Sequence, residues 1–374
     1  MPHHLINECV NENIKTKSYT YNNNKYEIIS HDKNAVDNEL IVSGKCIRSL
    51  ITHNGKVVCV SPFKSVAIDE FDWGAPQDIR ATKFIDGTMI NLFYNDAWII
   101  STRSTVGGNV SFFRSETYST FKTMFEDAVI QDYNDMESFY NELNKEYSYS
   151  FVLQHPSHRI VTPIENPTIY LVGIYKVDGY KVEYIDPFVS RDISIVKRPQ
   201  IIMTKEPLSK ESLSMLLNDE MFDWKMMGIH VQNKCTGIRT KLRNPKYEKM
   251  RMLRGNQPKL QYRFIEMKQN NDDIARFLQV WPEYKSHINN YTEKLATMCK
   301  TIYELYVKRY ITHEINTNDV PIMMRKMLYS LHNLYRGTGG LKSRGLKINY
   351  NVTYNHIISL PAPQIMFVMS RLSS

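Results

Sequence analysis

A basic and aromatic stretch between Arg239 and Lys268 is the part of the sequence best suited to bind phosphates. It holds ten Lys or Arg but only two acids, Glu248 and Glu266. Cations that pair with phosphates, next to aromatic rings that stack on bases, are what a single nucleic acid strand requires. The alternative is a solvated helix face whose Met and Leu side chains pack inward. The candidate nucleic-acid contacts are Arg243, Lys246, Tyr247, Arg251 and Arg254.

The overall charge also favours an anionic partner. The 374 residues carry a net charge of +8 and the sequence pI is about 9.0, although such an excess sets no partner by itself. The five cysteines lie far apart and form no CxxC pair. The sequence therefore supports neither a zinc site nor a disulfide framework, and it indicates a reducing compartment. No run of about 18 apolar residues occurs, so we expect no membrane span.

These side chains must be positioned by a strand-rich region that extends from about residue 41 to 240. Three turn signals predict hairpins, namely Asn54-Gly55, Asn95-Asp96 and Asp178-Gly179. Runs of β-branched and aromatic residues on either side of these turns predict the paired strands. Two short helices are expected between the strands, over residues 119–128 and 135–146.

After about residue 270 the apolar pattern becomes helical. Apolar residues recur at three- and four-residue spacing from Leu295 to Tyr306, and again from Met324 to Leu334. The second series stops before Gly337, a residue type that often ends helices. The predicted fold class is therefore α+β, with an antiparallel-sheet domain over residues 1–265 and an all-helical domain over residues 266–374.

Several stretches of the strand-rich region share their order and spacing with one protein family. They are residues 46–64, with Arg48 and Lys64; residues 82–104, with Lys83, Asp86-Gly87 and Arg103; residues 151–172; and, more weakly, residues 227–241, with Arg239 and Lys241. Together they resemble the nucleotidyltransferase domain of the phage-type RNA ligases, over roughly residues 40–245. The overall likeness is to ligase-like proteins of giant DNA viruses, which share the helical tail.

The resemblance implies that a lysine in the pattern Lys-x-Asp-Gly accepts AMP through its neutral amine. Phe84 stands at the position of that lysine, two residues before Asp86. Lys83 is one residue further away, and on a strand its side chain points to the opposite face unless a bulge turns it back. Lys83 is therefore the candidate nucleophile, displaced by one residue from the family pattern.

Two carboxylates of the family pattern are replaced as well. The resemblance assigns the ribose and a divalent metal to two glutamates, and Val152 and Met227 stand at their positions. A hard cation such as Mg²⁺ needs oxygen ligands, which these side chains lack. The basic positions are retained. The resemblance assigns nucleotide or phosphate binding to Arg48, Lys64, Asp86, Gly87, Arg103, Arg239 and Lys241.

We therefore expect an RNA ligase-like protein that retains phosphate binding and has lost its reactive groups. It would be a pseudoenzyme that binds RNA, a nucleotide, or a phosphorylated or capped RNA end, as a subunit or adaptor of a viral RNA-handling complex in the host cytoplasm or viral factory. One alternative is an active ATP-dependent RNA ligase that uses Lys83, ATP and Mg²⁺. A second alternative is a protein-interaction scaffold whose helical domain docks a partner and whose pocket is vestigial.

Overall fold

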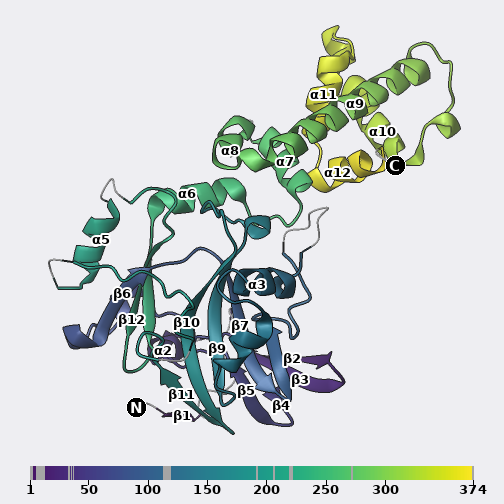
Figure 1. The fold of residues 1–374 in the computed structure, drawn as a ribbon. Helices are drawn as coiled ribbons and strands as arrows, with labels where there is room; N and C mark the ends of the chain where they lie inside the picture. Colours follow the sequence, from purple (N-terminus) through teal and green to yellow (C-terminus); the bar gives the residue numbers. More distant parts are fainter. Residues whose placement is uncertain are drawn as a thin grey trace. The chain divides into compact units, whose positions relative to one another are not determined.

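Antiparallel hairpins build the first of the two units into which the chain divides, Met1–Met252 and Leu253–Ser374. The computed structural model describes residues 3–5, 13–32, 34, 36, 38–112, 119–190, 193–204, 207–218, 222–270 and 273–372. Figure 1 shows the strands of the first unit in purple to teal and the helices of the second in green to yellow. The sequence predicted the domain boundary at residue 265, whereas the two units meet at Met252 and Leu253.

Three sheets make up the first unit, and every pairing between their strands is antiparallel. The strand orders are β1-β11-β10-β9-β7-β8, β13-β12-β6 and β2-β3-β4-β5. The strands are β1 (His3–Leu5), β2 (Ile14–Tyr21), β3 (Asn24–His31), β4 (Leu50–His53), β5 (Lys56–Val60), β6 (Ile79–Lys83), β7 (Thr88–Asn95), β8 (Ala97–Ser101), β9 (Tyr147–Gln154), β10 (Thr168–Asp178), β11 (Lys181–Ile185), β12 (Gly228–Asn233) and β13 (Arg239–Arg243).

The three predicted hairpins are present. Asn54 and Gly55 connect β4 to β5 with φ angles of 49° and 76°, the left-handed values that a tight hairpin turn requires. Asp96 connects β7 to β8 with φ 60°, and Gly179 connects β10 to β11 with φ 60°. The turn residues therefore predicted the positions of the hairpins.

The first unit also contains helices, two of which bury a large apolar cluster against the six-stranded sheet. They are α2 (Asn38–Val42), η1 (Ile68–Glu70), η2 (Pro76–Asp78), α3 (Phe121–Val129), α4 (Met136–Asn141), η3 (Pro156–His158), α5 (Lys210–Asn218) and α6 (Pro245–Arg254). Helices α3 and α4 fall where the sequence predicted two short helices. The rings of Phe125, Phe139 and Phe151 are fully buried and meet with centroids 5.5 to 6.2 Å apart. This contact packs α3 and α4 onto strand β9.

Strand β12 has two distinct faces. Ile229 and Val231 are fully buried and pack in one cluster with Leu213 and Leu217 of α5. Because side chains alternate along a strand, His230 projects from the opposite face. The β13-β12-β6 sheet is therefore closed on one side by apolar packing, which leaves its other side for polar chemistry.

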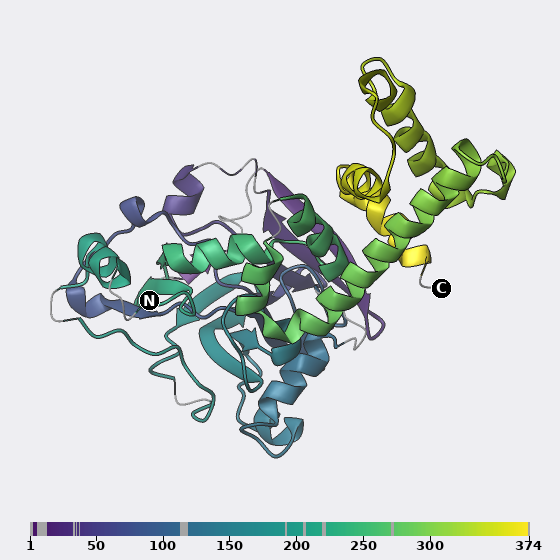
Figure 2. The ribbon, with the colours of Figure 1, turned by 90° about the horizontal axis from the view of Figure 1, so that it is seen from above.

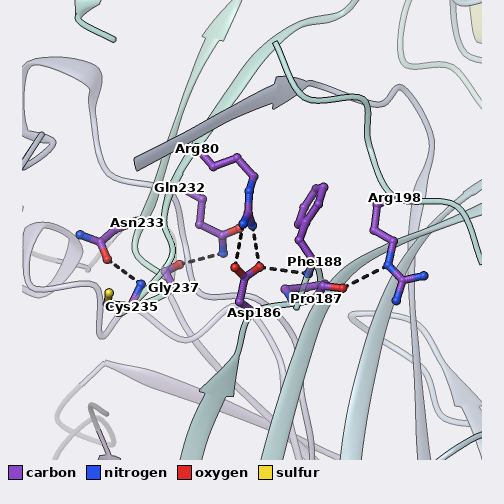
Figure 3. A network of polar contacts seen from close by, with 9 residues as sticks. All are labelled: Arg80, Asp186, Pro187, Phe188, Arg198, Gln232, Asn233, Cys235 and Gly237. Atoms are coloured by element: carbon purple, nitrogen blue, oxygen red, sulfur yellow. Dashed lines mark hydrogen bonds and ion pairs between the residues drawn. The ribbon is translucent and has the colours of Figure 1, made fainter. Parts of the chain in front are cut away.

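An ion pair joins this sheet to the six-stranded sheet. The Arg80 guanidinium of β6 donates to both oxygens of Asp186, which follows β11, at 2.6 and 2.8 Å (Figure 3). The Asp186 carboxylate also accepts the backbone N–H of Phe188 at 3.1 Å. The Phe188 ring lies 4.0 Å from the guanidinium carbon. With 13% and 8% of their side-chain surfaces exposed, the two charges are largely removed from water.

The second unit is helical throughout its regular structure in the described residues. It contains α7 (Leu260–Gln269), α8 (Ile274–Val280), η4 (Pro282–Tyr284), α9 (Lys285–Tyr310), η5 (Thr317–Asp319), α10 (Ile322–Arg336), η6 (Leu341–Arg344), α11 (Tyr350–Ile358) and α12 (Ala362–Arg371). The 26-residue helix α9 is the long green helix of Figure 2. Helix α10 ends before Gly337, as the sequence predicted. Among the described residues, each helix is too short or too polar to cross a membrane.

The ion pair between the sheets gives the first prediction. We expect Asp186→Ala to lower the free energy of unfolding by about 3 kcal/mol, because it leaves the largely buried Arg80 charge without its partner. Denaturant unfolding of the full chain measures this change. The matched control is the double variant Arg80→Met, Asp186→Leu, which removes both charges and should recover most of the loss. Equal stabilities for the wild type and Asp186→Ala would contradict the assigned role.

Candidate functional site

A cavity of about 680 Å³ in the first unit has seven cations and a single acid among the described residues that line it. Strands β12 and β13 contribute to one part of its wall, β7 and β9 to another, and the segment after β5 to a third. The one acidic residue among its lining residues in the described chain is Glu70, on η1. Its seven cationic lining residues are Arg48, Lys64, Arg103, Arg239, Lys241, Arg243 and Arg251. Five of the predicted phosphate-binding residues, far apart in the sequence, therefore meet at one cavity: Arg48, Lys64, Arg103, Arg239 and Lys241.

The replaced ligase positions lie in the same wall. Phe84, Val152 and Met227 all line the cavity, at the positions of the family's lysine and two glutamates. The Phe84 ring centre lies 6.0 Å from the Lys241 Nζ and 5.6 Å from the Arg243 guanidinium carbon. An aromatic ring with two cations near it therefore occupies the position of the expected amine.

Lys83 lies outside this cavity. Its backbone N–H donates to the Gln200 carbonyl at 2.8 Å, and its side chain is exposed. Lys83 lines two neighbouring hollows, one of about 50 Å³ and one of about 510 Å³, while Phe84 lines both of these as well as the cation-lined cavity. The one-residue displacement that the sequence indicated is therefore not reversed by a bulge that would bring Lys83 into the cavity wall.

Asp86 and Gly87 both support the local backbone, Asp86 through hydrogen bonds and Gly87 through its small size. The buried Asp86 carboxylate accepts the backbone N–H groups of Val161 and Thr162 at 3.0 and 2.9 Å, and it does not line the cation-lined cavity. Asp86 lines the neighbouring hollow of about 510 Å³ instead, so the predicted nucleotide contact stays a prediction. Gly87 does line the cavity, and a Cβ there would lie 2.4 Å from the Leu153 carbonyl oxygen. Its lack of a side chain lets the turn approach β9.

Burial, and then repulsion between the cations, lowers the pKa of two of the cavity residues. Burial, followed by repulsion from the neighbouring arginines, lowers the pKa of Lys241 from 10.5 to about 8. Burial, and then repulsion from Arg48, likewise lowers the pKa of Arg103. Removal from water and a neighbouring positive charge both disfavour the protonated form of a basic side chain, so each of them lowers its pKa. An anion in the cavity would relieve this repulsion.

Arg239 is held in place by the chain itself. Its Nε and Nη2 donate to the carbonyl oxygens of Phe63 and Pro62 at 2.9 to 3.2 Å. Its other terminal nitrogen, Nη1, donates no hydrogen bond to a side chain or carbonyl of the described residues. Arg239 therefore both fixes the segment after β5 and retains a donor for a ligand.

His230 is a cavity residue that the sequence-based interpretation missed. Its buried Nε2 has no hydrogen-bond partner in the described structure, and the ring centre lies 6.1 Å from that of Phe84. Burial, and then repulsion from Arg239 and Lys241, lowers the pKa of His230 to about 3, so the ring is neutral near pH 7. The alternation of Ile229, His230 and Val231 along a strand was the signal that could have identified it.

The predicted RNA contacts of α6 are largely engaged within the protein. Tyr247 is fully buried and Arg254 is 2% exposed, so neither can meet a nucleic acid strand in this structure. This corrects the prediction that Tyr247 stacks on a base and that Arg254 pairs with a phosphate. Burial, and then the nearby Asp86 charge, raises the pKa of Tyr247.

Three of these predicted contacts remain accessible at least in part. Arg243 and Arg251 both line the cavity and both pair with Glu248, at 2.7 and 3.1 Å. The Lys246 ammonium donates to the Phe222 carbonyl oxygen at 3.1 Å. Arg243 and Arg251 therefore extend the cation-lined cavity, while Lys246 fixes the start of α6.

The residues of the cavity do not fit a protein-held divalent metal ion. No group of three or more His, Cys, Asp or Glu that could hold a metal occurs among the described residues. Val152 and Met227 provide no oxygen ligands, and a hard cation needs several. The donors fit phosphate oxygens instead, because Arg and Lys side chains are hydrogen-bond donors with positive charge.

Comparison with known proteins gives relatives of viral origin. No family model matches the chain. The chain is 25% identical over 244 residues to an immediate-early protein ICP-46 homolog of Invertebrate iridescent virus 3, which covers 62% of this chain and 50% of that protein. It is 30% identical over 108 residues to an RNA ligase of Rhodothermus phage RM378, which covers 28% of this chain and 24% of that protein. The similarity to the phage protein confirms the resemblance to RNA ligases.

The chain spans half or less of the length of these two relatives. Among solved structures, an archaeal ATP-dependent RNA ligase is similar with a TM-score of 0.42 and 10% identity, over 68% of this chain and 62% of that chain. The predicted α+β class, with antiparallel sheets followed by helices, is confirmed by the architecture described above.

The low pKa of Lys241 gives a prediction for ligand binding. A bound phosphate stabilises the charged amine, so the contribution of Lys241 to ATP affinity should be nearly constant below about pH 7 and should fall about twofold between pH 7 and 8. Above about pH 8 it should fall, by up to about tenfold per pH unit, because the free protein must take up a proton to bind. Calorimetric titration with ATP across this range measures the effect.

The control for this prediction is Lys241→Gln, which keeps a polar side chain of similar length. It should bind ATP more weakly and should lose the dependence on pH above about pH 8. A wild-type affinity that stays level through pH 9 would show that Lys241 does not contact the phosphates.

Proposed function

We propose that the cation-lined cavity binds the phosphates of a nucleotide, or of a phosphorylated or capped RNA end, and that the chain is a ligase-like pseudoenzyme. The observation that carries this proposal is the composition of one wall. Seven cations line the cavity, while Phe84, Val152 and Met227 stand where ligase chemistry needs an amine and two carboxylates. Binding of anions is therefore favoured by the same wall that lacks the reactive groups.

The ligand class follows from the extent of the cationic surface. Arg48, Lys64 and Arg103 line the main cavity and also a second hollow of about 330 Å³. A single phosphate uses only a few donors, whereas a phosphate chain or a strand end can contact cations on both sides. The buried, partnerless Nε2 of His230 offers a polar contact for a base or sugar. This combination supports a nucleotide or an RNA end more than a small inorganic anion.

The alternative of ligation from Lys83 requires its amine to reach the α-phosphate in line. The exposed position of Lys83 outside the cavity wall argues against such a reaction. A ligase would also need ATP and Mg²⁺. The cations fit the phosphates of ATP, but the residues present do not supply the metal ligands, so we assign no step to a metal ion.

We further propose that the chain acts as a subunit or adaptor of a viral RNA-handling complex, in the host cytoplasm or a viral factory. The similarity to proteins of an iridescent virus and of a phage supports a viral role. An adaptor needs affinity without turnover, which is what a phosphate-binding cavity without a nucleophile provides. The helical unit then remains available for partners.

The test of this proposal separates binding from transfer. Purified protein is incubated with α-labelled ATP, and separately GTP, with Mg²⁺ or Mn²⁺, and is then resolved on a denaturing gel. We expect no labelled protein band. In parallel, binding of a 5′-phosphorylated RNA is measured for the wild type and for Arg48→Ala and Lys64→Ala. Each substitution removes a charge-assisted contact and should weaken binding by about tenfold or more.

Lys83→Ala is the matched control, because it removes a cation that lies outside the cavity and should leave the affinity for this RNA unchanged. A labelled band that disappears in Lys83→Ala would instead establish an active nucleotidyltransferase. Absence of nucleotide and RNA affinity, together with a co-purifying protein, would support the interaction scaffold.

A further inference from the structure

The net positive charge of the chain comes from the helical unit. Residues 253–374 contain 17 Lys or Arg and 8 Asp or Glu, a net charge of +9. Residues 1–252 contain 30 and 31, a net charge of −1. No Asp or Glu occurs from Val320 to Ser374, while seven Lys or Arg do. A surface with one sign of charge repels itself and attracts anionic partners.

The most concentrated part of this charge lies on the turn between α10 and α11. Lys342, Arg344 and Lys347 follow one another over six residues, and all three are exposed. Within the described chain, no acidic side chain pairs with them and none of their side-chain nitrogens makes a hydrogen bond. The turn is instead formed by backbone bonds, such as Leu346 N–H to the Leu341 carbonyl at 2.9 Å. The fold of the turn therefore does not depend on these three charges.

A hollow with aromatic walls lies close along the chain. It measures about 480 Å³ and is lined by residues of α9 together with Tyr350, the first residue of α11. Tyr303 and Tyr350 provide two phenol rings, and Lys300 also lines the hollow, where it pairs with Glu304 at 4.0 Å. Tyr350 follows Lys347 by three residues, so the two lie within about 11 Å along even a fully extended chain. At least one cation of the turn therefore lies near a ring of the hollow.

We propose that this surface, formed by Lys342, Arg344, Lys347 and the hollow of Tyr303 and Tyr350, binds single-stranded nucleic acid. The cations pair with backbone phosphates, and the tyrosine rings stack on bases. A polyanion without planar rings, such as a lipid headgroup surface, would satisfy the cations but not the hollow. The proposal is independent of the cation-lined cavity, since every residue of it lies in the helical unit.

The experiment compares two triple variants of the full chain. One is Lys342→Gln, Arg344→Gln, Lys347→Gln; the matched control is Arg276→Gln, Lys285→Gln, Lys308→Gln, which removes three exposed charges elsewhere on the same unit. Binding of a single-stranded RNA with a 5′-hydroxyl end is measured against salt concentration. We expect the first variant alone to reduce the slope of log affinity against log salt by about 2, since each lost phosphate contact removes about 0.7.

Stacking is tested at the hollow. Tyr350→Leu should weaken RNA binding by about fivefold or more, whereas Tyr350→Phe should keep the wild-type affinity because the ring remains. Thermal unfolding verifies that each variant is folded, and ATP binding in the cavity should be unchanged in all of them. If Arg48→Ala loses ATP binding while these RNA results hold, the two sites are distinct. If ATP does not bind and neither a 5′-phosphate nor a cap increases the affinity for RNA, the cavity proposal fails and this one stands.

Three results would overturn the proposal. Equal losses of affinity in the two triple variants would mean that only net charge matters. Unchanged RNA binding in the first triple variant or in Tyr350→Leu would exclude the surface or its hollow. Binding to phosphatidylserine vesicles that exceeds binding to RNA, and that is lost in the first triple variant, would assign the surface to a membrane instead.

Discussion

The Arg80–Asp186 pair is the constraint on which the cavity depends. The cation-lined cavity takes its walls from two different sheets, and like charges across it push those walls apart. The bidentate bonds of 2.6 and 2.8 Å join β6 to the segment after β11, which fixes one sheet against the other. Because the pair is largely buried, its attraction is screened little by water or salt. This ion pair therefore holds the two sheets together despite the repulsion between the cations that line the cavity.

The residues around Phe84 show how the wall tolerates that lining. An aromatic ring presents a negative face, so the Lys241 and Arg243 charges near Phe84 gain a weak attraction where a lysine would have added repulsion. Backbone carbonyls hold the Arg239 guanidinium, and Glu248 holds Arg243. These three cations are thus compensated locally by a dipole, a ring or a single acid. The replacement of lysine by phenylalanine fits the electrostatics of a binding site that has no covalent step.

Local signals predicted what depends on local geometry. The Asn54-Gly55 and Asp178-Gly179 turns fixed two hairpins because their left-handed φ values suit few other residues. The cations at Arg48 and Lys241 were predicted from their motifs, and the structure brings them to one cavity. Whether Tyr247 faces solvent or the core was not predictable, since one face of a helix looks the same in sequence until its packing partner is known. The pairing of Arg80 with Asp186 was not predictable either, since the two residues lie 106 positions apart in the sequence.

The distribution of charge between the units carries the last step of the synthesis. The first unit is nearly neutral overall, yet it gathers seven cations at one cavity, so its long-range field is weak and its local field is strong. The helical unit has the opposite character, with an excess of +9 distributed over its helices and turns. Because the first unit has a weak long-range field and a strong field inside the cavity, it favours a small anionic group that enters the cavity and loses its bound water. A spread field attracts a long polyanion at a distance and holds it by many exchangeable contacts. The two units therefore differ in the kind of anion that their charge attracts: a small group in the first unit and an extended chain of phosphates in the second.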